Sequence, residues 1–132
     1  MKKSISILSN IDNVALVENF VDSLCVDIDI SEDDYGNIFV AIIEAVTNAI
    51  KHGNKNDATK YVFVDAVYDN GFLEIDVKDE GLGFDYNNLP DPTLPDNILK
   101  FSGRGIYLIR SLSDKLEFYE GGTLLKIFFN LH

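Results

Sequence analysis

The segment EAVTNAIKHGN (residues 44–54) contains two polar residues, Glu44 and Asn48, that lie one helical turn apart if the segment is helical. At an advance of about 100° per residue they share a helix face with Ala41, opposite an apolar stripe. A carboxylate can accept a proton from an attacking hydroxyl or water, and a carboxamide oxygen is a hard ligand suited to Mg²⁺. An ordinary solvated helix face explains the same pair, so the chemical interpretation depends on what these side chains face.

Asp79 continues the apolar register of a strand. In FLEIDVK (residues 72–78) apolar and polar residues alternate, as is typical of a half-buried strand. One further step places Asp79 on the core face, and Gly81 and Gly83 follow it. An inward carboxylate at a strand end can accept the exocyclic amino group of adenine, and the two glycines would leave room for the purine ring. An ordinary turn explains DEG equally well.

A third candidate is the GRG tripeptide formed by Gly103, Arg104 and Gly105. Glycine backbone can approach a phosphate closely, and the N–H groups at a helix start point toward bound anions. The signal is weak alone, because turn glycines explain most such pairs. The P-loop pattern and the Rossmann glycine fingerprint are both absent from the sequence.

The first half of the chain predicts one strand and two helices. KSISILS (residues 3–9) is a strand candidate, and apolar spacing predicts a helix over roughly 10–26. Cys25 falls in the apolar register of that helix, which favours core filling over a nucleophile. Ser31 can cap the second helix, and HGN at 52–54 supplies a terminating glycine.

The second half predicts two hairpins separated by a long loop and a helix. DNG at 69–71 is a strong hairpin signal, and a second hairpin turns at Gly121–Gly122. Residues 84–102 contain all three prolines and no sustained periodicity, as expected of a lid or binding loop. The order β-α-α-β-β-loop-α-β-β predicts an α+β two-layer sandwich, with a mixed, mainly antiparallel sheet covered by helices on one face.

Length and charge narrow the class of protein. Residues 1–132 are expected to form a single domain. The net charge of −11, from 11 basic and 22 acidic residues, argues against direct binding to nucleic acid. Apolar runs are far shorter than the ~20 residues that span a bilayer, and the N-terminus lacks a signal-peptide pattern. We therefore expect a cytoplasmic protein without a membrane segment.

Three motifs in this order resemble one family. EAVTNAIKHGN (44–54), DEGLGFD (79–85) and GRGIYLIRSLSDKLEF (103–118) look like the N, G1 and G2 boxes of the GHKL (Bergerat-fold) ATPases. More closely, they resemble the anti-sigma-factor serine kinases of bacterial partner-switching systems. The expected topology fits that family from one end of the chain to the other.

The resemblance implies a role for each candidate residue. Glu44 matches the family's general base, Asn48 its Mg²⁺ ligand and Asp79 its adenine-reading aspartate. Residues 84–102 correspond to the ATP lid. The remaining implied nucleotide-binding positions are Gly81, Gly83, Gly103, Arg104, Gly105 and Thr123, although a strand threonine is usually only a strand residue.

The implied activity is transfer of the ATP γ-phosphoryl group to a serine or threonine of a STAS-type anti-anti-sigma factor. A sigma factor is the second expected partner, and the family tends to form homodimers. An alternative is an ATP-binding module that sequesters a sigma factor without significant transfer. Tyr107 stands where histidine-kinase domains often have a third glycine, and no upstream phosphoacceptor-histidine helices are evident, which favours the stand-alone serine-kinase branch. A nucleotide-independent scaffold would leave Asp79 and the long loop without purpose.

Overall fold

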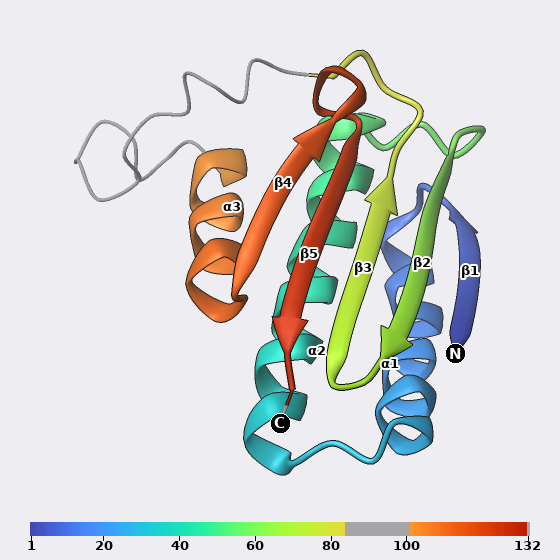
Figure 1. The fold of residues 1–132 in the computed structure, drawn as a ribbon. Coiled ribbons are helices and arrows are strands. Elements are labelled where there is room, and N and C mark those ends of the chain that lie inside the picture. Colours follow the sequence, from blue (N-terminus) through green and yellow to red (C-terminus); the bar gives the residue numbers. More distant parts are fainter. Residues whose placement is uncertain (84–100, 132) are drawn as a thin grey trace.

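A computed structural model describes residues 1–83 and 101–131, with the backbone alone for 101–104. Five strands form one sheet in the order β1-β2-β3-β5-β4 (Figure 1). Every neighbouring pair is antiparallel, where the sequence predicted a mixed, mainly antiparallel sheet. The predicted order of strands and helices and the α+β class are confirmed.

The strands follow the period-two alternation of the sequence. Their bounds are β1 Lys2–Leu8, β2 Tyr61–Asp69, β3 Phe72–Lys78, β4 Lys115–Tyr119 and β5 Leu124–Asn130. In the β2–β3 turn, Asn70 and Gly71 have φ values of 49° and 87°. Two consecutive positive φ values are those of a tight hairpin turn whose twist matches its strands, which confirms the hairpin predicted from DNG.

The helices begin and end close to the predicted positions. A 3₁₀ turn at Ile11–Asn13 leads into α1 at Val14–Asp27, and α2 covers Glu32–Asn48 before a π-helical turn at Ala49–Gly53. Ser31 caps α2 as predicted, because its side chain accepts a hydrogen bond from the backbone N–H of Asp34 at 3.2 Å.

The last helix, α3 at Phe101–Leu112, begins earlier than the sequence suggested. The predicted lid ends inside it, because residues 101 and 102 are helical, and residues 84–100 lie outside the described residues. GRG therefore occupies the third to fifth positions of the helix instead of opening it.

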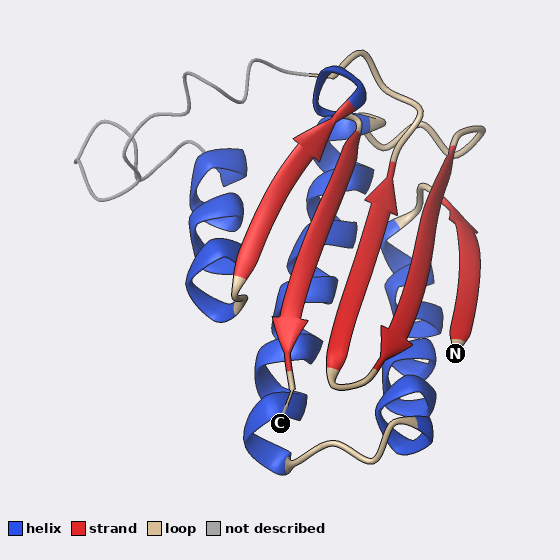
Figure 2. Ribbon diagram, viewed as in Figure 1, coloured by secondary structure: helices blue, strands red, loops and turns tan. Residues whose placement is uncertain are grey.

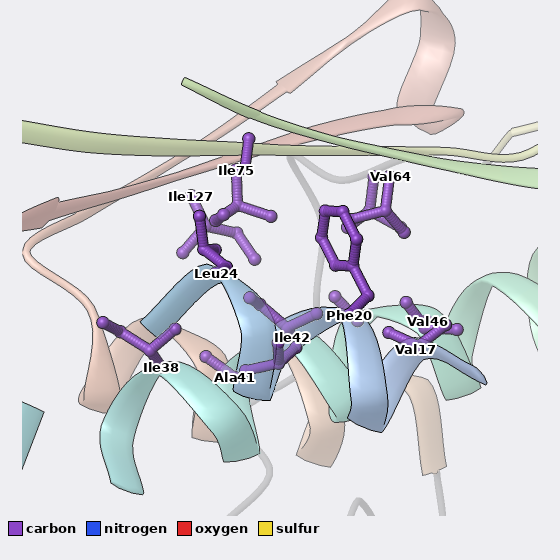
Figure 3. Packing of buried hydrophobic residues seen from close by; sticks show 14 of the residues in the cluster. Val17, Phe20, Leu24, Ile38, Ala41, Ile42, Val46, Val64, Ile75 and Ile127 are labelled. Atoms are coloured by element: carbon purple, nitrogen blue, oxygen red, sulfur yellow. The ribbon is translucent and has the colours of Figure 1, made fainter. Parts of the chain in front are cut away.

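Helices α1 and α2 cover one face of the sheet, and α3 lies beside α2 near the β4 edge (Figures 1 and 2). The core fills the space between these layers. Figure 3 shows Ile75 and Ile127 of the sheet directed toward Leu24 and Ile42 of the helices, and all four are fully buried. Burying each such side chain contributes about 1.5–3 kcal/mol, so this apolar layer anchors the elements that carry the polar candidates.

Cys25 belongs to the same core. It is buried and makes no disulfide. Burial raises the pKa of its thiol to about 11, with Asp22 as a second cause. A thiol that stays protonated at neutral pH is a poor nucleophile, which agrees with the core-filling role expected from the sequence.

One face of α2 was misjudged from the sequence. Ala41 was expected on the solvated side with Glu44 and Asn48, but Ala41 is completely buried and Ala45 nearly so. Helix α3 packs against α2, and Ile109 of α3 is also completely buried. The side of α2 that carries Asn48 therefore faces another helix.

In the described part of the chain, none of the helices combines the length and apolar character required to cross a bilayer.

Candidate functional site

Three distant segments meet at one end of the sheet. They are the π-helical turn after α2, the loop after β3 and the turn between β4 and β5 (Figure 1). The N–H of Asp79 donates to the carbonyl of Thr123 at 2.9 Å, which extends the β3–β5 pairing by one residue. Asp79 therefore keeps the strand register and faces inward, with 9% of its surface exposed.

The Asp79 carboxylate is held in a defined direction. Its Oδ1 accepts the N–H of Gly81 at 2.8 Å, and its Oδ2 lies against Gly53, where any side chain would overlap it. Burial raises the pKa of Asp79, while the Gly81 N–H and the charge of Lys60 act in the opposite direction. The result is a partly desolvated acceptor with one oxygen paired and the other packed against the π-helical turn.

Close packing of the chain requires both glycines of this loop. Gly81 and Gly83 were expected to leave room for a purine. The space beside Gly81 is filled by the carbonyl of Gly53, and the space beside Gly83, which has a φ of 81°, is filled by the carbonyl of Gly121. These glycines let the three segments approach one another closely.

Gly53 was predicted to end the helix, because glycine often terminates a helix, but the structure gives another reason for a glycine at this position. It is not among the residues with positive φ. The helix instead widens into a π-helical turn, in which the N–H of Asn54 donates to the carbonyl of Ala49 at 2.8 Å. Gly53 is required because the carboxylate of Asp79 occupies the position of a side chain.

A cavity of about 220 Å³ opens among these segments and α3. Four predicted residues line it: Asn48, Asp79, Gly83 and Thr123. Its apolar walls include Ala45, Ala49, Val77, Ile106, Phe118 and Leu125. An apolar hollow with a few convergent polar groups is the usual form of a small-molecule site, and this one is smaller than the roughly 300–1,000 Å³ of most ligand pockets. It therefore suits a flat ring better than a whole nucleoside triphosphate.

Asn48 presents unpaired polar atoms at this cavity. Its Oδ1 and Nδ2 are both buried and have no hydrogen-bond partner within the described residues. Gly105 of α3 lies against the amide, so that any side chain at 105 would overlap it. A buried amide without partners is costly, and a hard cation bound to its oxygen would supply the missing partner.

The residues around Asn48 bear on which cation would fit. The described residues contain no group of three or more His, Cys, Asp or Glu side chains able to hold a metal ion. Mg²⁺ is commonly bound through one or two protein oxygens, with water and phosphate oxygens completing its octahedron. A single amide ligand fits that pattern.

The other predicted residues lie around the cavity. Glu44 is partly exposed, one turn before Asn48, and is not among the cavity-lining residues. Gly103 lies in the first turn of α3, where the backbone N–H groups have no partner within the helix, whereas Arg104 and Gly105 follow that turn. A cradle for an anion at the start of α3 would therefore involve the backbone of residues 101–103.

Sequence reasoning missed two residues of this region. His52 lines the cavity, and burial, with the charge of Lys51 as second cause, lowers its pKa. Its spacing of four from Asn48 was a usable signal, because it places both on one helix face. Asn54 is buried next to the Asp79 loop, and no local signal distinguishes it from a turn asparagine.

Residues 7–129 match the profile of a family described as "Histidine kinase-like ATPase domain". The chain belongs to this family. The resemblance inferred from the three motifs is thereby confirmed, and the match covers nearly the whole of this chain.

Curated relatives of this ATPase-family chain include the serine-protein kinases RsbW of Bacillus thuringiensis (strain Al Hakam) and Bacillus cereus (strain AH820). Each is 39% identical over 101 residues, which is 70% of this chain and 62% of the relative. The matched region thus spans less than two thirds of the length of these relatives. A solved structure of the RsbU and RsbW domains of Rv1364c from Mycobacterium tuberculosis superposes with a TM-score of 0.70 at 18% identity, over 99% of this chain and 32% of that one. That likeness supports the fold.

Proposed function

We propose that this chain binds Mg-ATP and transfers the γ-phosphoryl group to a serine or threonine of a STAS-type anti-anti-sigma factor, and that it also binds a sigma factor. The inward carboxylate of Asp79 in an apolar cavity carries the proposal, because it is an acceptor suited to the amino group of adenine. The names of the RsbW relatives support the transfer to a protein hydroxyl.

The proposed pocket divides the nucleotide between two environments. The cavity takes the adenine, with Asp79 as the polar contact. The phosphates extend past Asn48 toward the first turn of α3, where backbone N–H groups favour an anion. This arrangement accounts for an acidic protein binding a polyanion, because backbone dipoles and a metal ion, instead of a basic surface, meet the charge.

Asn48 is the residue that would hold the metal, through its unpaired Oδ1. Bound Mg²⁺ would neutralise charge on the phosphates. The reaction forms a bond between the protein hydroxyl oxygen and the γ-phosphorus and breaks the bond from that phosphorus to the oxygen of ADP. Glu44 accepts the hydroxyl proton, and its partial exposure beside the cavity leaves it open to a macromolecular substrate.

Single-turnover transfer at saturating Mg-ATP tests this proposal, with purified STAS proteins encoded nearby as candidate acceptors. Glu44→Gln should retain Mg-ATP affinity and lose ~10²–10⁴-fold in transfer, the usual contribution of a general base. Asn48→Ala should instead lose Mg²⁺-dependent nucleotide binding together with transfer. Glu32→Gln, the same chemical change at an exposed position of the same helix, is the matched control and should be silent.

The outcomes separate the proposed kinase from the sequestering module. If the parental protein binds Mg-ATP and a sigma factor but no acceptor becomes phosphorylated, the sequestering function is supported instead. Transfer at the parental rate by Glu44→Gln contradicts the general-base assignment. Absence of ATP binding by the parental protein overturns the proposal as a whole.

A further inference from the structure

Asn54 is the first residue beyond the π-helical turn, and it is buried, with 2% of its surface exposed. It has no part in the proposed chemistry. Its side-chain nitrogen donates to Ser9 Oγ at 2.7 Å and to the Tyr61 carbonyl at 3.0 Å. Its side-chain oxygen accepts the N–H of Glu80 at 2.8 Å. One amide thus joins the end of β1, the start of β2 and the loop after β3.

The chemistry of its partners determines the orientation of this amide. The Glu80 N–H can only donate and the Tyr61 carbonyl can only accept, so the oxygen and nitrogen of Asn54 cannot exchange places. The Ser9 hydroxyl donates to the carbonyl of Lys60 at 2.7 Å and is therefore free to accept from Asn54. An ionised aspartate of the same shape would keep the bond to Glu80 but could not donate to the Tyr61 carbonyl or to Ser9.

These hydrogen bonds act next to the key carboxylate. The N–H that Asn54 holds belongs to the peptide that directly follows Asp79, and the next N–H, of Gly81, donates to the Asp79 carboxylate. Glu80 reinforces the anchor, because its side chain accepts the N–H of Tyr61 at 2.6 Å. The π-helical turn holds Asn54 from the other side through its bond to Ala49. The direction of Asp79 thus depends on a peptide that Asn54 fixes in place.

We propose that Asn54 is a positioning residue for the nucleotide pocket, holding the Asp79–Glu80 peptide so that the Asp79 carboxylate stays directed into the cavity. The inference rests on the proposed ATP-binding function and extends it to a residue that touches neither nucleotide nor metal. It predicts an effect on nucleotide affinity that is separable from an effect on the chemical step.

Asn54→Asp tests the inference, since it preserves shape and the acceptor for Glu80 but places an oxygen against the Tyr61 carbonyl. We expect ADP and ATP to bind about tenfold more weakly, the equivalent of one adenine hydrogen bond. The rate of transfer at saturating ATP should stay within a few-fold of the parental rate, so that KM changes and kcat does not. Faster hydrogen exchange at the Gly81 amide should accompany the change without nucleotide.

The control must separate positioning from simple loss of stability. Ile38 is completely buried in the N-terminal half of α2, away from the end that carries Asn48. Ile38→Val or Ile38→Ala, whichever matches the thermal destabilisation of Asn54→Asp, should leave ADP affinity unchanged. If Asn54→Asp does not fold, Ser9→Ala, which removes one of the three side-chain bonds, should weaken ADP binding about two- to threefold.

Each possible result supports or overturns the positioning role of Asn54. Parental ADP affinity in folded Asn54→Asp, or in Ser9→Ala where the first variant fails to fold, overturns the positioning role. An equal loss of affinity in the Ile38 control also overturns it, because stability alone would then explain the effect. If the parental chain binds no nucleotide by calorimetry, the proposed function fails first and the positioning role falls with it.

Discussion

Replacing Asp79 with asparagine changes one atom of the pocket. The side-chain oxygen of asparagine can still accept the N–H of Gly81, which Asp79 accepts at 2.8 Å. The amide nitrogen then takes the place of Oδ2, so that a donor would stand where, in the proposed pocket, the adenine amino group also donates. A mispaired polar contact of this kind costs about 1–3 kcal/mol, which corresponds to roughly a 5- to 150-fold weaker affinity.

The same substitution should not destabilise the protein. Burial raises the pKa of Asp79, so the folded state favours the protonated, neutral form more than the unfolded state does. The ionised carboxylate therefore costs stability at pH values above its unfolded pKa of about 4. A neutral amide removes that cost, and Asp79→Asn should be as stable as the parental protein at pH 7 or more stable.

Two measurements on the same samples test this combination. Isothermal titration calorimetry with ADP gives the affinity, and urea unfolding at pH 7 without nucleotide gives the stability. The expected result is weaker binding in a protein of equal or greater stability. An unchanged affinity in the folded variant would remove Asp79 from the adenine pocket, and a loss of stability would contradict the role given to burial.

Two further variants test the packing of Gly53 against Asp79 and the ionisation of Asp76, a residue of β3. Gly53→Ala should displace the Asp79 carboxylate that occupies its side-chain position and weaken ADP binding at least tenfold; calorimetry giving parental affinity would contradict the close packing. Burial and a hydrogen bond with Glu74 raise the pKa of Asp76 to about 6, and Lys126 opposes the shift. The folded state therefore holds a proton that the unfolded state releases above about pH 4, and stability falls as pH rises from about 4 to 6. Asp76→Asn should flatten this dependence and be more stable than the parental protein at pH 7.5 in urea unfolding; lower stability there would contradict it.

Local patterns in the sequence were sufficient for the elements and for the direction of Asp79. A strand has a period of two, so the register of β3 alone placed Asp79 on the inner face. The DNG turn and the Ser31 cap each depend on residues within four positions of one another, and both occur as predicted. Helical spacing also placed Glu44 and Asn48 one turn apart, although it did not reveal what covers them.

The surroundings of these residues depended on contacts between distant parts of the chain. The side-chain amide of Asn48 is buried because α3 packs on α2 with Gly105 against it, and no pattern within α2 encodes that neighbour. A glycine is required at position 53 because the carboxylate of Asp79, 26 positions later in the sequence, lies where a side chain would be. From its neighbours in the sequence Asn54 resembles an ordinary turn residue, yet its side-chain amide forms hydrogen bonds with Ser9 and Glu80 from two other parts of the chain. Sequence periodicity indicates which face of its own helix or strand a side chain occupies. Close approach and hydrogen-bond pairing instead depend on two segments at once, and only folding brings those segments together.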